Sequence, residues 1–161
     1  MNKTNAMRML SGAKLKYRIQ EYTVDENDLS GLHVAEQIGQ DPSAVFKTIV
    51  VRGEKRGIVV LCIPVDRVID LKKAARAVGD KRLEPVHVKE LLGLTGYIRG
   101  GCSPIGMKKK YPTYFHSSAR ELTEIAVSAG VRGAQIIMAP AELIAFVEAE
   151  VADLCVGDDQ A

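Results

Sequence analysis

Residues 100–106, Gly-Gly-Cys-Ser-Pro-Ile-Gly, constrain the fold of this chain more than any other stretch. Three glycines and a proline within seven residues exclude the middle of a helix or of a central strand, because glycine favours positive φ and proline lacks an N–H donor. A loop of this composition can direct backbone N–H groups toward one point and bind an anion. The lysines that follow, Lys108–Lys110, add positive charge there. The alternative is a tight connection followed by a solvated charged turn, and composition favours neither.

The length and the cysteines indicate the class of protein. A chain of 161 residues can bury a substantial core without disulfides, so we expect one domain over residues 1–161, with a loose acidic tail over 153–161. The apolar runs are too short to span a bilayer, and no secretory signal is visible. Three cysteines, odd in number and widely spaced, are typical of a reducing compartment. We therefore expect a cytoplasmic protein without membrane association.

Charge is distributed unevenly along the chain. Residues 47–120 carry 16 basic and 6 acidic side chains, whereas the whole chain has a net charge of only +2. A basic central segment favours an anionic partner, and the phosphate backbone of a nucleic acid is the commonest large one. The alternative is that these charges alternate in space and cancel.

Hydrophobic periodicity predicts a mixture of helices and strands. We expect helices over residues 2–11, 31–38, 71–78 and 87–92 and after Pro140, and strands over 17–24, 45–51, 58–65, 113–116, 125–127 and 134–138. Ser30 and Asp70 are typical N-caps, and Gly39, Gly79 and Gly93 are typical helix ends. The order lacks strict βαβ alternation. It predicts an α+β domain with a mixed sheet that closes into a barrel-like core with flanking helices.

Lys47 interrupts an otherwise apolar face of the strand at 45–51, which it shares with Val45, Ile49 and Val51. Lysine is rarely buried alone, because desolvating the ammonium group is costly. Either the stem lies along the apolar surface with its amine in solvent, or the amine points into a pocket that binds an anion. The first arrangement is the commoner one in proteins.

No metal or nucleotide motif is present. His33, His87 and His116 are far apart in the sequence and lack the spacing of a metal site, so we expect neither a metal nor a cofactor. The chain has no G-x-S-x-G elbow and no G-x-x-x-x-G-K-[ST] loop.

Several motifs in order resemble the YbaK/EbsC family of aminoacyl-tRNA deacylases, relatives of the editing domain of bacterial prolyl-tRNA synthetases. They are Val45-Phe46-Lys47-Thr48, the loop 100–106 with its lysines, and Val127-Ser128-Ala129-Gly130 followed by Arg132-Gly133. The resemblance runs from about residue 5 to residue 156. It implies a mixed β-barrel with flanking helices and hydrolytic clearance of Cys-tRNA(Pro). It also implies a substrate-assisted step, in which the cysteine thiol attacks its own ester and releases tRNA and a cyclic thioester.

The resemblance implies roles for individual residues. Lys47 matches a lysine that holds the 3′-terminal adenosine or its phosphate, and Gly100 or Gly101 matches the glycine whose backbone lines the reacting carbonyl. The implied substrate-binding residues are Tyr22, Ser30, Gly31, Thr48, Ser103, Pro104, Ser128 and Gln135. The expected tRNA-binding residues are Lys72, Lys73, Arg76, Lys108, Lys109 and Lys110.

The sequence departs from the family pattern at two positions. Ser30 stands where many relatives have phenylalanine, and Gln135 stands where some have an acidic residue. Both changes concern amino-acid preference more than reaction type, so Ala-tRNA(Pro) remains an alternative substrate. The expected partners are tRNA(Pro) and, through it, prolyl-tRNA synthetase, and the family suggests a monomer.

Two other functions remain open. Cys102 lies on the glycine loop and is a candidate nucleophile for a thiol hydrolase, with the lysines at 108–110 as the cationic environment that would activate it. The basic segment alone is also compatible with a non-catalytic RNA-binding module.

Overall fold

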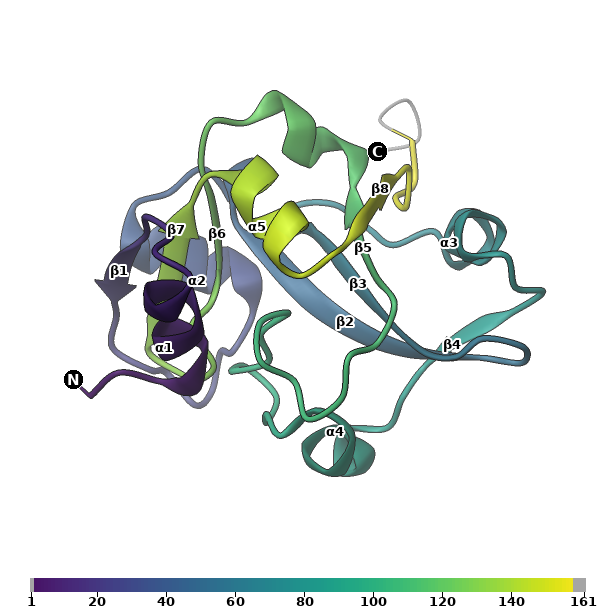
Figure 1. The fold of residues 1–161 in the computed structure, drawn as a ribbon, viewed down its shortest axis with the longest axis horizontal. Helices are drawn as coiled ribbons and strands as arrows, with labels where there is room; N and C mark the ends of the chain where they lie inside the picture. Colours follow the sequence, from purple (N-terminus) through teal and green to yellow (C-terminus); the bar gives the residue numbers. More distant parts are fainter. Residues whose placement is uncertain (1, 158–161) are drawn as a thin grey trace.

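A long antiparallel hairpin forms the centre of the molecule. In the computed structural model, which describes residues 2–157, β2 (Phe46–Gly53) pairs with β3 (Gly57–Pro64) along their whole lengths. The five-stranded sheet around them has the order β4-β2-β3-β5-β8. The strands β4 (Leu83–Pro85), β5 (Thr113–His116) and β8 (Glu150–Ala152) complete it, and β5 runs parallel to both β3 and β8. Figure 1 shows the hairpin crossing the molecule behind α5.

A second, three-stranded sheet has the order β1-β7-β6 and is antiparallel throughout. Its strands are β1 (Arg18–Glu21), β7 (Ala134–Met138) and β6 (Ile125–Ser128). Among residues 2–157, one parallel bridge, Val45 to Ala126, connects it with the larger sheet. Neither sheet closes, so the prediction of a barrel was wrong, whereas the mixed α+β class is confirmed. Alternating apolar residues define which face of a strand is buried, but not whether the edge strands of a sheet meet.

Five α-helices flank the sheets within the described residues. They are α1 (Asn5–Gly12), α2 (Gly31–Ile38), α3 (Leu71–Val78), α4 (Val88–Thr95) and α5 (Pro140–Phe146). Short 3₁₀ turns occur at Pro42–Ala44 and Ser117–Glu121. The predicted caps are confirmed: the Ser30 hydroxyl accepts the N–H of His33, and the Asp70 carboxylate accepts two N–H groups in the first turn of α3. Gly39 and Gly79 end their helices in the left-handed conformation.

The helix α4 is longer than the sequence predicted. It passes through Gly93 and ends at Thr95, and the capping residue Gly96 that follows has a φ of 87°. Both glycines are exposed, and only the second adopts a conformation that requires glycine. Two glycines three residues apart offer two possible stops, and the local sequence does not choose between them.

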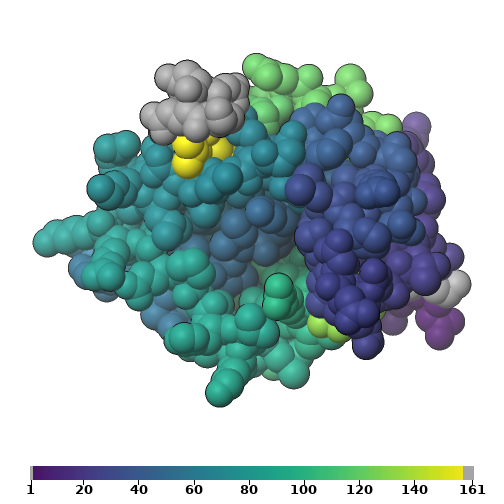
Figure 2. All heavy atoms as spheres, turned by 180° about the vertical axis from the view of Figure 1, so that it is seen from behind, coloured from purple at the N-terminus to yellow at the C-terminus, as the bar shows by residue number. Residues whose placement is uncertain are grey.

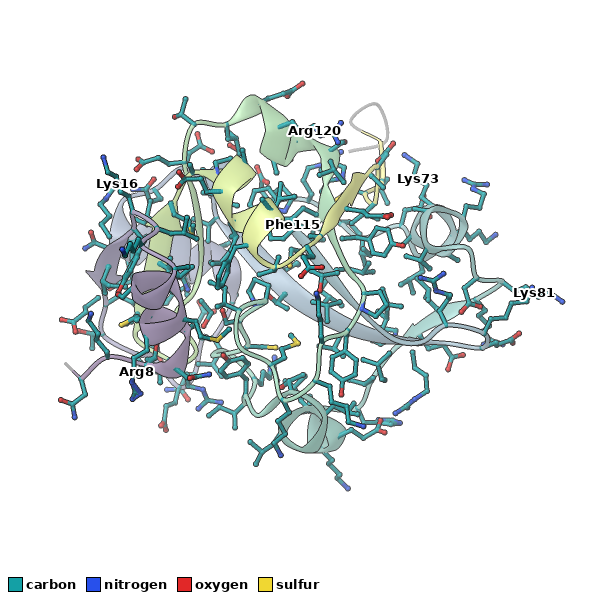
Figure 3. All side chains as sticks on the ribbon, viewed as in Figure 1. Arg8, Lys16, Lys73, Lys81, Phe115 and Arg120 are labelled. Carbon is teal, nitrogen blue, oxygen red and sulfur yellow. The ribbon has the colours of Figure 1, made fainter. Side chains whose placement is uncertain are left out.

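The core lies between the two sheets and beneath the helices. Phe46 and Phe115 pack in its centre with ring centroids 6.1 Å apart, and Figure 3 labels Phe115 behind α5. A second cluster lies beneath α3 and includes Leu154 and Cys155, both fully buried. The loose tail expected from residue 153 therefore does not begin there, and residues 158–161 of that expectation lie outside the described residues.

Within residues 2–157, no helix has both the length and the apolar character needed to cross a membrane. Over the same range, no three His, Cys, Asp or Glu side chains lie close enough together to hold a metal ion.

Candidate active site

A cavity of about 390 Å³ lies where α2, β2, the glycine loop and the β6–β7 hairpin meet. Figure 2 shows this hollow between the dark blue surface of the segment that carries α2 and the teal to green surface of residues 88–105. Its lining residues are Leu29, Ser30, Gly31, Leu32, Val34, Val45, Phe46, Lys47, Thr48, Val65, Gly100, Cys102, Ser128 and Gln135. Segments far apart in the sequence thus form one pocket.

Most of the residues expected to bind substrate lie together in this cavity. The expected residues that line it are Lys47, Gly100, Ser30, Gly31, Thr48, Ser128 and Gln135. Four others, Gly101, Ser103, Pro104 and Tyr22, are not among its lining residues.

Lys47 lies on β2 and combines features of the two arrangements considered for it. Its side chain is exposed, yet it lines the cavity. Within residues 2–157, no carboxylate lies within 4 Å of its ammonium group. An unpaired ammonium at the mouth of a cavity can bind a ligand anion without the full cost of burying a charge.

The β6–β7 hairpin contributes two polar side chains. Ser128 and Gln135 are directly opposite each other in its register and are only 8% and 5% exposed. The Ser128 hydroxyl accepts the N–H of Gly130 at 3.1 Å. The Gln135 Oε1 atom has no hydrogen-bond partner among the described residues. Because an unpaired buried acceptor is costly, this oxygen favours a ligand that carries a donor.

The glycine loop presents Gly100 and Cys102 to the cavity but turns Gly101 away from it. The N–H of Gly101 donates to the carbonyl of Ile98 at 2.9 Å, which closes a tight turn. The N–H groups of Gly100 and Cys102 have no acceptor within residues 2–157. They are therefore available to an oxygen of a bound ligand.

Close packing explains why Gly101 is a glycine. A β-carbon at this position would lie 3.2 Å from the backbone of Val131 and Arg132 in the neighbouring hairpin. The Arg132 guanidinium also donates to the carbonyl of Arg99 at 2.8 Å. The loop and the β6–β7 hairpin are thus held together at the cavity.

Three further residues that were expected to bind substrate lie outside this cavity. Ser103 is fully buried, and its hydroxyl accepts the N–H of Ile105. Pro104 lines a second cavity of about 250 Å³ on the side of the molecule that carries α1 and α5. Tyr22 packs against the apolar cluster beneath α2. None of these three residues lines the cavity that contains Lys47.

Cys102 lines the cavity, but burial raises the pKa of its thiol to about 11. At pH 7 such a thiol is ionised in about one molecule in ten thousand. Because the thiolate is the reactive form, the environment of Cys102 disfavours a nucleophilic role.

The six expected tRNA-binding residues lie in two separate places. Lys72 and Arg76 are exposed on α3, whereas Lys109 and Lys110 line the second cavity. Figure 3 shows Lys73 and Lys81 at the end of the molecule that carries α3 and β4. The Lys73 ammonium is already engaged, because it donates to Asp153 at 3.1 Å and to the Cys155 carbonyl at 2.9 Å.

Ion pairs also occupy other basic residues. Lys110 is paired with Glu148, and Arg52 with Glu90. The positive charge of residues 47–120 is therefore partly neutralised, and Lys72 and Arg76 remain without an ion pair within residues 2–157.

Sequence reasoning missed the apolar wall of the cavity. Leu29, Leu32 and Val65 line it, and Leu32 is 51% exposed. Helical periodicity identified the buried face of α2, and Val34 on this face lines the cavity, but Leu32 lines it from outside that face. The local signal for this wall was the apolar pair beside Ser30 and Gly31, of which Leu29 is half-buried and Leu32 exposed.

Comparisons with known proteins show which family the chain is similar to. The model of the aminoacyl-tRNA editing domain family matches residues 32–146. The chain is 47% identical over 152 residues to EbsC of Enterococcus faecalis, a protein named as a candidate Cys-tRNA(Pro)/Cys-tRNA(Cys) deacylase, and the match covers 94% of this chain and 93% of that one.

Solved structures share the fold. A crystal structure described as that of a candidate trans-editing enzyme for prolyl-tRNA synthetase is 28% identical, with a TM-score of 0.80 over 97% of this chain and 100% of that one. The hypothetical protein APE2540, at 20% identity, has a TM-score of 0.83 over 92% of this chain and 97% of that one.

Proposed function

Because the chain belongs to the aminoacyl-tRNA editing domain family, we propose that it is a stand-alone deacylase that clears mischarged Cys-tRNA(Pro). The observation that carries the proposal is the single cavity that contains Lys47, Gly100 and Gln135. The name of EbsC refers to Cys-tRNA(Pro) as a substrate. The description of the trans-editing structure refers to prolyl-tRNA synthetase.

The cavity suits a small aminoacyl group. Its volume of about 390 Å³ falls within the range of about 300–1,000 Å³ that is typical of small-ligand sites. It can accept the aminoacyl ester and part of the terminal ribose, while the rest of a tRNA lies outside. The ammonium of Lys47 is positioned at the mouth, where a phosphate or ribose oxygen of the terminal nucleotide would enter.

The reaction needs no nucleophile from the protein. In the proposed step the thiol sulfur of the substrate attacks its own ester carbon and forms a carbon–sulfur bond. The bond from that carbon to the ribose oxygen breaks, and the thiol proton ends on the ribose hydroxyl. The products are tRNA and a four-membered cyclic thioester, so atoms and electrons balance without water.

Electrostatic stabilisation and positioning would supply the rate. As the sulfur attacks, negative charge develops on the ester carbonyl oxygen, and preorganised donors stabilise it. The N–H groups of Gly100 and Cys102 are the candidate donors, because both residues line the cavity and neither N–H has an acceptor within residues 2–157. The Gln135 Oε1 atom would accept a hydrogen bond from the substrate's α-ammonium group.

The test is a deacylation assay with Cys-tRNA(Pro), Ala-tRNA(Pro) and S-methylcysteinyl-tRNA(Pro). We expect the wild type to cleave the first at least tenfold faster than the third, whose sulfur cannot form the cyclic thioester. The variant Lys47→Ala should lose about a hundredfold in kcat/KM. Lys16→Ala is the matched control, because it removes an exposed lysine that neither lines this cavity nor belongs to the expected tRNA-binding residues, and it should keep wild-type activity.

The outcomes separate the alternatives. If no ester is lost faster than in buffer, the deacylase proposal is wrong, and salt-dependent RNA binding without turnover would indicate a binding module. Equal cleavage of Cys- and S-methylcysteinyl-tRNA would exclude the self-attack mechanism and leave attack by water. Preferential cleavage of Ala-tRNA(Pro) would assign the other small substrate.

A further inference from the structure

Exposed apolar side chains are concentrated in α4 and the turn that follows it. Val88, Leu92 and Ile98 are 62%, 54% and 48% exposed, and they account for half of the large apolar side chains exposed on the described residues. Val88 and Leu92 are four residues apart on one helix, so they share a face. Exposed apolar clusters with polar surroundings are typical of interaction surfaces.

This surface is continuous with the mouth of the cavity. The carbonyl of Ile98 accepts the N–H of Gly101, and this bond closes a turn. Gly100 lies within that turn and lines the cavity. The exposed Leu32 lines the cavity from α2. In Figure 2 the teal surface of the α4 region borders the hollow.

The charge of the α4 surface suits an anionic partner. Within Val88–Arg99 the basic side chains are Lys89 and Arg99, both exposed. The single acidic residue in this stretch, Glu90, is held by the guanidinium of Arg52 at 2.8 Å. The surface therefore offers apolar contacts and uncompensated positive charge.

We propose that residues 88–99 bind the unpaired nucleotides that precede the terminal adenosine of the tRNA acceptor end. This inference rests on the proposed function for its substrate class. A cavity of about 390 Å³ holds little beyond the aminoacyl ester and its ribose, so the following nucleotides leave through the mouth. Unpaired bases present apolar faces joined by phosphates, which matches a surface of apolar side chains flanked by Lys89 and Arg99.

The test compares two fluorescent RNA hairpins, one an acceptor-stem hairpin with the unpaired 3′ end ACCA and the other the same hairpin with a blunt end. For the wild type we expect the overhang to tighten binding about fivefold or more. In the variants Leu92→Ser and Ile98→Ser this gain should fall to less than twofold, while affinity for the blunt hairpin stays unchanged. The control Met9→Ser removes an exposed apolar side chain that lines the other cavity and should keep the full gain.

The same variants distinguish this inference from the proposed function. With 3′-O-cysteinyl adenosine, which lacks the other nucleotides, Leu92→Ser should equal the wild type, whereas with Cys-tRNA(Pro) its KM should rise. A wild type that gains nothing from the overhang, or variants that keep the gain, would overturn the inference even if Cys-tRNA(Pro) is cleaved. In that case the apolar surface of α4 would be assigned to a protein partner. An overhang gain in the absence of any ester cleavage would support it and overturn only the deacylase.

Discussion

The backbone of Gly31 lies against the side chain of Val65, so that a β-carbon on Gly31 would stand 2.2 Å from the Val65 Cγ1 atom. Gly31 is the first residue of α2, and Val65 follows β3, so this contact sets how closely the helix approaches the sheet at the cavity wall.

Gly31→Ala should therefore displace the start of α2 and lower both stability and activity. We expect a loss of about 1–3 kcal/mol in the free energy of unfolding, measured by denaturant titration, because overpacking forces the neighbours apart. The double variant Gly31→Ala/Val65→Ala makes room for the new methyl group and should recover part of the deacylation activity. If the double variant is no better than Gly31→Ala, the contact does not position the helix.

Gln135→Leu should separate stability from function. The Oε1 atom of Gln135 is buried without a partner among the described residues, so replacing the amide with an apolar group of similar size removes a desolvation penalty of about 1–3 kcal/mol. We expect the thermal midpoint to stay level or rise while kcat/KM for Cys-tRNA(Pro) falls at least tenfold. A fall in both quantities would indicate a structural role for this side chain.

Cys102→Ser should retain deacylation activity. Burial raises the pKa of the Cys102 thiol to about 11, so the thiolate is scarce at neutral pH. For the same reason alkylation of Cys102 by iodoacetamide, followed by mass spectrometry, should be slow at pH 7 and accelerate up to about pH 11. Loss of activity in Cys102→Ser would make this residue a candidate nucleophile again.

Asp80→Asn should destabilise the end of the β2–β3 hairpin. The N–H of Arg56 contributes most to holding the pKa of the Asp80 carboxyl below its usual 3.8, followed by those of Lys55, Arg82 and Lys81. Since the folded-state pKa is lowered, the stabilisation is present above about pH 4 and is lost as the pH falls through the folded-state pKa.

The difference in thermal midpoint between wild type and Asp80→Asn should consequently be constant from pH 8 to pH 5 and shrink below pH 4. Asp66→Asn is a suitable control, because the exposed Asp66 carboxylate makes no hydrogen bond or ion pair within residues 2–157. A difference that persists unchanged at pH 2 would contradict the ionic role of Asp80.

Removing Lys72 and Arg76 of α3 should weaken tRNA binding more than removing Lys109, which lies on the side of α1 and α5. For Lys72→Ala/Arg76→Ala we expect the slope of log Kd against log salt to fall by about 0.7–0.9 for each phosphate that these side chains neutralise in the wild type. Lys109→Ala should leave the slope unchanged, because Lys109 lines the cavity near α1 and α5. Equal effects would place the tRNA across both sides.

The amino-acid sequence by itself determined most of the helices and strands and the types of residue in the site, but not the short strands β4 and β8. Side-chain oxygens at Ser30 and Asp70 and glycines at the ends of α2 and α3 set those helices by interactions within a few residues, which sequence patterns record directly. The family motifs likewise identified Lys47 and Gly100 as cavity residues.

The tertiary structure alone decided how these parts meet. Whether the sheets close depends on the pairing of edge strands that are far apart in the sequence. Within residues 2–157 the two sheets stay separate and are joined by one bridge, from Val45 to Ala126. The partners of Lys73, which are Asp153 and the Cys155 carbonyl, also lie on a distant segment. Such contacts follow from the packing of the whole chain, and short-range patterns carry no information about them.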